Sequence, residues 1–157
     1  MRILINSFLQ GTSIIPTFFN TQALATGISY GDLGDDEPIG GTGYDTLVGG
    51  AGNNILTGGK GKDTFLLIHE EGQNLIVDFN PKKDVIGLTN DLSNSAPFHG
   101  LIMTFDDITF LCSNITVTAT GKVLATLEGF DTTTLTAANF VSAVFPEFFG
   151  DNFYGTD

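Results

Sequence analysis

Residues 40–66 decide the architecture of this chain, because they read GGTGYDTLV, GGAGNNILT and GGKGKDTFL in three consecutive units of nine. A fourth unit, GDLGDDEPI, precedes them from Gly31 in the same frame. Glycine is concentrated here, since 11 of its 20 positions lie between Gly31 and Gly61. A fixed period over consecutive units is the signature of a repeat fold, in which each unit needs its neighbours to bury a core. We therefore predict a stack of short coils.

Each unit divides into a turn of six residues and a strand of three. The turn, Gly-Gly-x-Gly-x-Asp, has glycine where the backbone needs positive φ or close approach. The strand places one apolar side chain inward, which predicts Leu47, Leu56 and Phe65 as core residues. Two units complete one coil, so loops on the same side of the stack recur every 18 residues.

Stacked loops bring acidic side chains together. The 18-residue spacing predicts that Asp45 lies against Asp63 and Asp36 against Asn54. Neighbouring parallel strands are about 4.8 Å apart, and two carboxylates at that distance repel each other by about one to several kcal/mol. A hard cation relieves this repulsion, and calcium accepts about six to eight oxygen ligands, backbone carbonyls included. The loops therefore predict a calcium site rather than a magnesium site, since magnesium demands tighter geometry.

Composition excludes several classes of function. The chain has 157 residues and 16.7 kDa, enough for one domain. Its 18 acidic and 6 basic residues leave a net charge of −12, which disfavours nucleic acid and anionic membranes as partners. A hydrophobic share of 41% excludes a disordered acidic tail. The single Cys excludes an internal disulfide and a Cys-based metal cage. No stretch approaches the roughly 18 apolar residues of a membrane helix, so we expect no membrane span.

After Leu66 the glycine repeats end and β-strand signals replace them. Residues 101–111 and 115–127 are rich in Ile, Thr, Phe and Val, and residues 120–122 read as a turn between two strands. Residues 136–140 predict one short helical turn. No long amphipathic helix is visible, so the chain is predicted to be nearly all β.

The three in-phase units resemble the nonapeptide GGxGxDxUx of the RTX, or hemolysin-type, calcium-binding family. Residues 73–79 and 84–88, QNLIVDF and DVIGL, resemble the segment that follows the last repeat in many members. Residues 123–130 and 135–141 resemble the closing segment of such domains. The resemblance implies an all-β fold, in which a parallel β-roll continues into a sandwich-like or roll-like C-terminal part.

The resemblance also implies a set of calcium ligands. A main site would lie between loops 40–45 and 58–63, with carboxylates from two aspartates and carbonyl oxygens from the glycine turns. A weaker second site would lie between loops 31–36 and 49–54, because Asp32 replaces a glycine there, Pro38 takes the inward position and Asn54 replaces an aspartate. Asp78 is implied as a cap of the stack. The main site comprises Gly40, Gly41, Thr42, Gly43, Asp45, Gly58, Gly59, Lys60, Gly61 and Asp63, and the weaker site Gly31, Leu33, Asp36, Gly50, Gly52 and Asn54.

Four segments are expected along the chain. Residues 1–30 are predicted to be strands that pack on the roll, because polar residues and Pro16 interrupt the apolar region that a signal peptide would need. Residues 31–66 are the calcium-binding repeats, and residues 67–144 a β-rich capping region. Residues 145–157 are an aromatic, acidic tail. This tail is either an uncleaved segment for one-step (type I) export, as the family resemblance implies, or the start of another repeat-like block.

No catalytic motif is present, so we expect that the chain is not an enzyme. Residues 69–71, HEE, begin a zinc-protease pattern, but Gln73 stands where the second histidine ligand would be. The predicted function is that of an exported calcium-binding β-roll, secreted or at the cell surface, whose folding is coupled to calcium. The alternative is a calcium-dependent accessory module of a secreted protease, lipase or polysaccharide epimerase, which binds an extracellular glycan or protein through residues 101–130. A third hypothesis, tight turns without metal, does not explain an aspartate in phase with the repeat.

Overall fold

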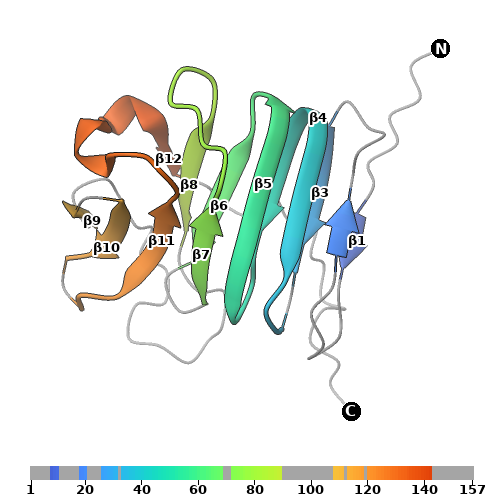
Figure 1. The fold of residues 1–157 in the computed structure, drawn as a ribbon, viewed down its shortest axis with the longest axis horizontal. Coiled ribbons are helices and arrows are strands. Elements are labelled where there is room, and N and C mark those ends of the chain that lie inside the picture. Colours follow the sequence, from blue (N-terminus) through green and yellow to red (C-terminus); the bar gives the residue numbers. More distant parts are fainter. Residues whose placement is uncertain are drawn as a thin grey trace.

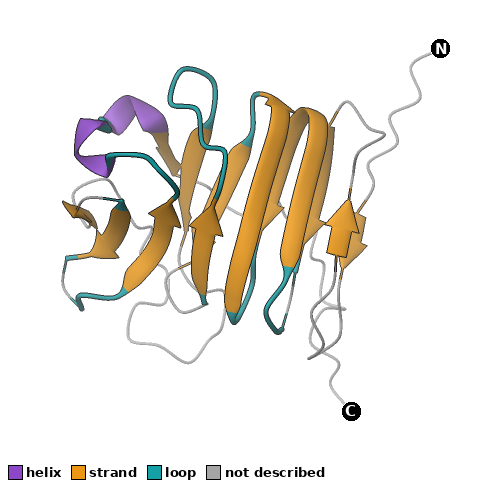
Figure 2. Ribbon diagram, viewed as in Figure 1, coloured by secondary structure: helices purple, strands orange, loops and turns teal. Residues whose placement is uncertain are grey.

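The computed structural model describes residues 8–10, 18–20, 26–31, 33–68, 72–89, 108–111, 113–118 and 120–142. These residues form a curled sheet of mostly parallel strands, which lie side by side along the molecule (Figure 1). Helical residues within them are confined to two short 3-10 turns, Thr132–Thr134 and Ala137–Asn139, beside the last strand (Figure 2). The predicted all-β roll is confirmed.

The strands follow one another with little intervening chain in the repeat region. In chain order they are β1 (Phe8–Gln10), β2 (Phe18–Asn20), β3 (Thr26–Tyr30), β4 (Glu37–Val48), β5 (Asn53–Gly61), β6 (Thr64–Ile68), β7 (Gln73–Ile76), β8 (Val85–Thr89), β9 (Ile108–Leu111), β10 (Asn114–Val117), β11 (Val123–Leu127) and β12 (Phe140–Ser142).

Two parallel walls enclose the core of the roll. One wall runs through β3, the end of β4, β6, β8 and β12, and it pairs Leu47 with Phe65 and Phe65 with Ile86. The other wall runs through the start of β4, β5, β7 and β11, and it pairs Leu56 with Ile76. The chain passes through each wall once per coil of 18 residues, so Leu47 and Phe65, which are 18 residues apart, are neighbours on the same wall.

The strands are longer than the three residues that the repeat predicts. β4 has 12 residues and β5 has nine, because pairing continues through the glycine turns, with Gly41 opposite Gly59 and Gly43 opposite Gly61. Main chain meets main chain here without side chains between them. A Cβ atom on Gly61 would overlap the carbonyl oxygen of Gly43, so glycine is required for the close approach.

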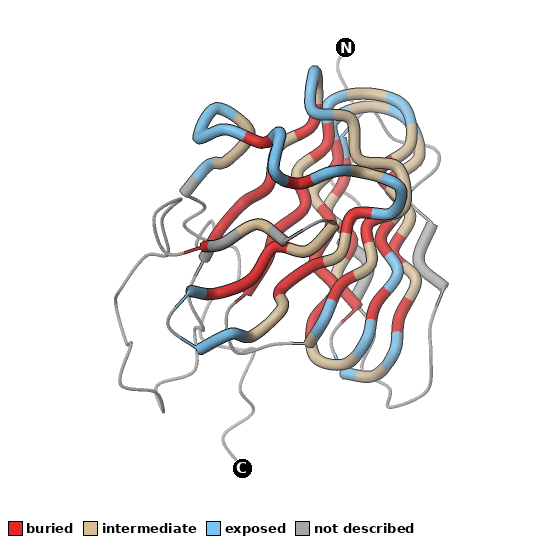
Figure 3. The backbone as a smooth tube through the Cα atoms, turned by 60° about the vertical axis from the view of Figure 1, so that its left-hand side comes forward, coloured by how far each residue is buried: buried red, intermediate tan, exposed pale blue. Residues whose placement is uncertain are grey.

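One hydrophobic core links the repeats to the C-terminal part (Figure 3). Leu47, Leu56 and Phe65 have no exposed surface, which confirms the inward positions predicted for them. Phe79 then stacks edge-on against Phe65 at 6.0 Å between ring centroids and against Phe130 at 5.8 Å. These contacts hold the segment after the last repeat against the roll.

Beyond the repeats, the roll is extended at both ends. β1, β2 and β3 add parallel strands on the N-terminal side. At the other end, β9, β10 and β11 are antiparallel, and Gly121 turns the chain between β10 and β11 with φ of 70°. The predicted turn at residues 120–122 and the short helical turn near residue 137 are confirmed. The tail of residues 145–157 and the residues 69–71 lie outside the described residues.

No helix in the described part of the chain is long and apolar enough to cross a membrane.

The close pairing of glycine turns makes Gly61 a sensitive position. Gly61→Ala should lower the free energy of unfolding by about 2–5 kcal/mol, because it adds a side chain at φ of 136° and overlaps Gly43. Gly121→Ala is the matched control, since its φ is 70° but nothing lies within 4 Å of the added atom. It should cost about 1–2 kcal/mol. Urea unfolding in chelator measures both, and equal losses would contradict the close-packing explanation.

Candidate calcium site

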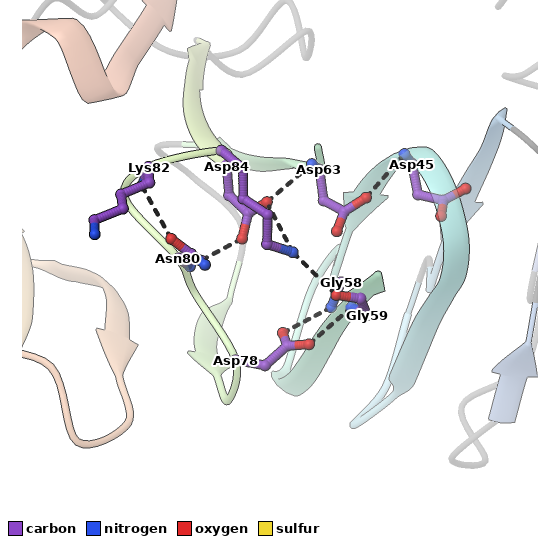
Figure 4. Close-up of polar contacts among 9 residues, drawn as sticks. Asp45, Gly58, Gly59, Asp63, Asp78, Asn80, Lys82 and Asp84 are labelled. Atoms are coloured by element: carbon purple, nitrogen blue, oxygen red, sulfur yellow. Dashed lines mark hydrogen bonds and ion pairs between the residues drawn. The ribbon is translucent and has the colours of Figure 1, made fainter. Parts of the chain in front are cut away.

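A ladder of aspartates runs along one edge of the roll, where successive loops stack (Figure 4). The backbone amide of Asp45 donates to Asp63 Oδ1 at 3.1 Å, and the amide of Asp63 donates to Asp84 Oδ1 at 3.1 Å. Each carboxylate therefore holds the main chain of the preceding loop. The structure places Asp45 against Asp63, as the 18-residue spacing predicts.

Three oxygen atoms of this ladder lack a hydrogen-bond donor. Asp45 is 2% exposed and Asp63 is fully buried. Both carboxylate oxygens of Asp45 and the Oδ2 atom of Asp63 are buried without a hydrogen bond. A buried acceptor without a donor costs about 1–3 kcal/mol, and more when it is charged. Buried, unsatisfied carboxylate oxygens of this kind fit a bound cation, which would supply the missing partner.

Burial and charge repulsion act together on these two carboxyl groups. Burial, and secondly the neighbouring Asp63 carboxylate, raise the pKa of Asp45 to about 6, while the nearby backbone amide of Gly27, which does not reach hydrogen-bond geometry, opposes the rise. Burial also raises the pKa of Asp63, and the amide of Asp45 opposes that rise. Without a cation, this part of the ladder therefore holds protons more tightly than free aspartates do.

Glycine makes room for both carboxylates at the first position of each loop. A Cβ atom on Gly40 would lie 2.9 Å from Asp45 Oδ2, and one on Gly58 would lie 2.7 Å from Asp63 Oδ2. Each carboxylate thus folds back over the start of its own loop. Among the described residues, three or more His, Cys, Asp or Glu side chains nowhere come together in a group that could hold a metal ion by itself. An ion at Asp45 and Asp63 would need main-chain oxygens as well, and calcium accepts such ligands.

The remaining residues of the implied main site could offer an ion only main-chain oxygens. Thr42 and Lys60 are exposed and face each other across β4 and β5, so their side chains lie at the surface. The carbonyl oxygen of Gly43 accepts the Lys62 amide at 3.2 Å. The carbonyl oxygen of Gly59 accepts the Lys83 ammonium at 3.1 Å. Two of the implied carbonyl ligands are therefore already hydrogen-bonded.

On the opposite side of the roll, the second candidate site contains an amide in place of the acid. The Asp36 amide donates to Asn54 Oδ1 at 3.0 Å. Asn54 Nδ2 donates to the carbonyl oxygen of Gly50 at 3.1 Å and to Asn74 Oδ1 at 3.4 Å. The carbonyl oxygen of Gly52 accepts the Gln73 amide at 2.9 Å. Leu33 is exposed and bridges to Ala51. These donors favour the expectation of a weaker site, which stays a prediction.

Asp78 is joined to the repeats by two hydrogen bonds. Its Oδ1 atom accepts the Gly58 amide at 2.8 Å and its Oδ2 atom accepts the Gly59 amide at 2.7 Å (Figure 4). Asp78 therefore binds the start of loop 58–63, the position implied for a cap.

Sequence reasoning did not place Lys83, Asp84 or Asn74 in these ladders. Asn74 follows Asn54 by 20 residues and Asp84 follows Asp63 by 21 residues, so both lie outside the 18-residue offset. The resemblance of residues 73–88 to the segment after the last repeat was the signal that could have found them.

Comparison with known families identifies the repeats. Residues 30–65 match the sequence model of the family described as RTX calcium-binding nonapeptide repeat, in four copies. This segment is an RTX repeat block. The match covers the three in-phase units and the divergent unit from Gly31, which confirms the resemblance of the repeats. The resemblance of residues 73–88 and 123–141 to the segments that follow the repeats stays a prediction. RTX repeats imply a calcium-binding β-roll, and the fold agrees with that. No curated protein sequence matches this chain.

The raised pKa of Asp45 predicts that the stability of the metal-free fold falls as the pH rises, whereas the affinity for calcium increases. The folded state binds the Asp45 proton more tightly than the unfolded chain, so this group stabilises the metal-free fold at low pH. That contribution is lost as the pH rises through about 6. A carboxylate must be ionised to bind a metal, so with Asp45 as a ligand calcium affinity should rise roughly tenfold from about pH 5 to about pH 7.

Melting curves in chelator and calcium titrations at both pH values measure these effects. In the Asp45→Asn variant, calcium affinity should change little between the two pH values. Equal calcium affinity of the unmodified protein at both pH values would contradict the assignment of Asp45.

Proposed function

We propose that this chain is an exported calcium-binding β-roll domain whose fold is completed by calcium. The proposal depends on one observation above all: within an RTX repeat block, two stacked and buried aspartates present three oxygens without a donor. Asp45 and Asp63 would hold the ion, together with main-chain oxygens of loops 40–45 and 58–63. The bound ion would supply the positive charge that this buried group lacks.

The same electrostatics suggests how the domain senses its surroundings. At low calcium, repulsion between Asp45 and Asp63 opposes close stacking of their loops. Calcium sites of extracellular modules have Kd values of about 10⁻⁴–10⁻³ M. Binding to the folded form alone then adds about 1–2 kcal/mol per site at about tenfold excess of calcium. We infer that the loops are loose inside the cell and close in the calcium-rich medium outside.

Calorimetric titration with calcium tests the proposal directly. We expect saturable binding in the range of about 10⁻⁴–10⁻³ M, with a rise in melting temperature and a gain of β signal in circular dichroism. Addition of chelator should reverse all three changes. A protein that binds no calcium, or whose spectrum and melting temperature ignore it, would contradict the proposal.

The ligand role of Asp45 separates this site from general charge effects. Asp45→Asn should weaken calcium binding at least about tenfold, because it removes a formal charge from the ligand set. It should also reduce the calcium-induced rise in melting temperature. Glu128→Gln is the control, since it makes the same change of charge at an exposed turn far along the chain. Equal effects of the two variants on calcium affinity would reject Asp45 as a ligand.

In this proposal the chain binds calcium and does not catalyse a reaction. The accessory-module hypothesis remains a further prediction, because residues 101–107 of the segment 101–130 lie outside the described residues. A pull-down of extracellular glycans and proteins, with and without calcium, tests it.

A further inference from the structure

The acidic ladder continues for one step beyond the candidate calcium site. We call the gap between loops 40–45 and 58–63 the calcium tier, and the gap between loop 58–63 and residues 78–84 the terminal tier. The terminal tier lies on the same edge of the roll as the calcium tier. It is also bordered by aspartates on successive coils, Asp63 and Asp84. Geometry alone would therefore allow a second cation there.

The two carboxylates that residues 78–84 bring to the terminal tier, Asp78 and Asp84, have both oxygens hydrogen-bonded. Asp84 Oδ1 accepts the Asp63 amide, and Asp84 Oδ2 accepts the Asn80 amide at 2.9 Å. Both oxygens of Asp78 accept glycine amides. By contrast, Asp45 and Asp63 together have three buried oxygens without a donor. The two tiers therefore differ in their need for an external cation.

Lys83 supplies positive charge inside the terminal tier. Its Nζ atom donates to the carbonyl oxygen of Gly59 at 3.1 Å and lies 3.6 Å from Asp84 Oδ1. The Asp84 side chain is 1% exposed and that of Lys83 is 33% exposed, so the ammonium reaches inward from a partly covered stem. An ammonium offers three donors and one charge, which suits a position between carbonyl and carboxylate oxygens.

The carbonyl that Lys83 binds has an equivalent on the other side of the roll. Gly59 and Gly50 are both the second glycine of their nonapeptide units. The carbonyl oxygen of Gly50 accepts Asn54 Nδ2 at 3.1 Å, as that of Gly59 accepts Lys83. On each side, a side-chain nitrogen thus binds this carbonyl at the point where the acidic repeat pattern ends.

We propose that the Lys83 ammonium is a built-in substitute for calcium, which fills the terminal tier and ends the row of ions on this edge at the calcium tier. The inference rests on the proposed calcium function and extends it to the number of ions. Removal of the ammonium should leave a cation position that calcium can fill.

The test compares Lys83→Met with Lys82→Met. Both variants remove one positive charge, but Lys82 is exposed and only its backbone amide contacts the turn, at Asn80 Oδ1. Lys83→Arg keeps the charge in place. For each full-length variant, calorimetry gives the number of calcium ions bound, and circular dichroism gives the melting temperature in chelator and in saturating calcium.

We expect Lys83→Met to bind one calcium ion more than the unmodified protein, whereas Lys82→Met and Lys83→Arg bind the same number as the unmodified protein. In chelator, Lys83→Met should melt below Lys82→Met, and calcium should close that gap. An equal number of ions in the two methionine variants would overturn the inference. So would an extra ion in Lys83→Arg, or a Lys83→Met protein that stays unfolded in saturating calcium.

The same experiment separates this inference from the proposed function. Absence of calcium binding by the unmodified protein would reject the proposed function, whatever the variants do. An ion bound by Lys83→Met and not by Lys82→Met would then still support the substitute role of Lys83.

Discussion

The structure depends on a hydrogen bond that joins each loop to the next one on the same side of the roll. Asp63 accepts the backbone amide of Asp45 one coil earlier, and Asn54 accepts the backbone amide of Asp36. This bond brings a charged side chain into a buried position, because the loops can stack only at the spacing of neighbouring strands. When the loops stack, the carboxylates that join them therefore become buried as well.

Buried charge requires compensation, and the roll uses two kinds. Asn54 replaces a carboxylate by an amide that binds its own loop. Lys83 brings an ammonium to Asp84 and Gly59. Asp45 and Asp63 keep three carboxylate oxygens without a donor, and burial raises the pKa of both groups. A buried charge without a partner destabilises a fold far more than a satisfied one, so this is the step at which an ion would change stability most.

The hydrophobic core and the acidic edge are built by the same repeats. Two residues after Asp63, Phe65 points inward and has no exposed surface, and Asp45 and Leu47 are related in the same way. A change in the spacing of the loops therefore moves the core residues as well. This direct connection explains why we expect a cation at the edge to affect the melting of the whole roll.

The period of nine residues was sufficient to predict the parallel roll, the inward Leu47 and Phe65, and the contact between Asp45 and Asp63, because an unbroken repeat converts sequence distance directly into spatial register. Its predictive power ended where the period ended. Asn74 and Asp84 rejoin the ladders after 20 and 21 residues, since loops absorb the extra residues while hydrogen bonds restore the register. Only the tertiary structure showed that Lys83 reaches Gly59, because the sequence does not say which carbonyl a long, flexible side chain will find.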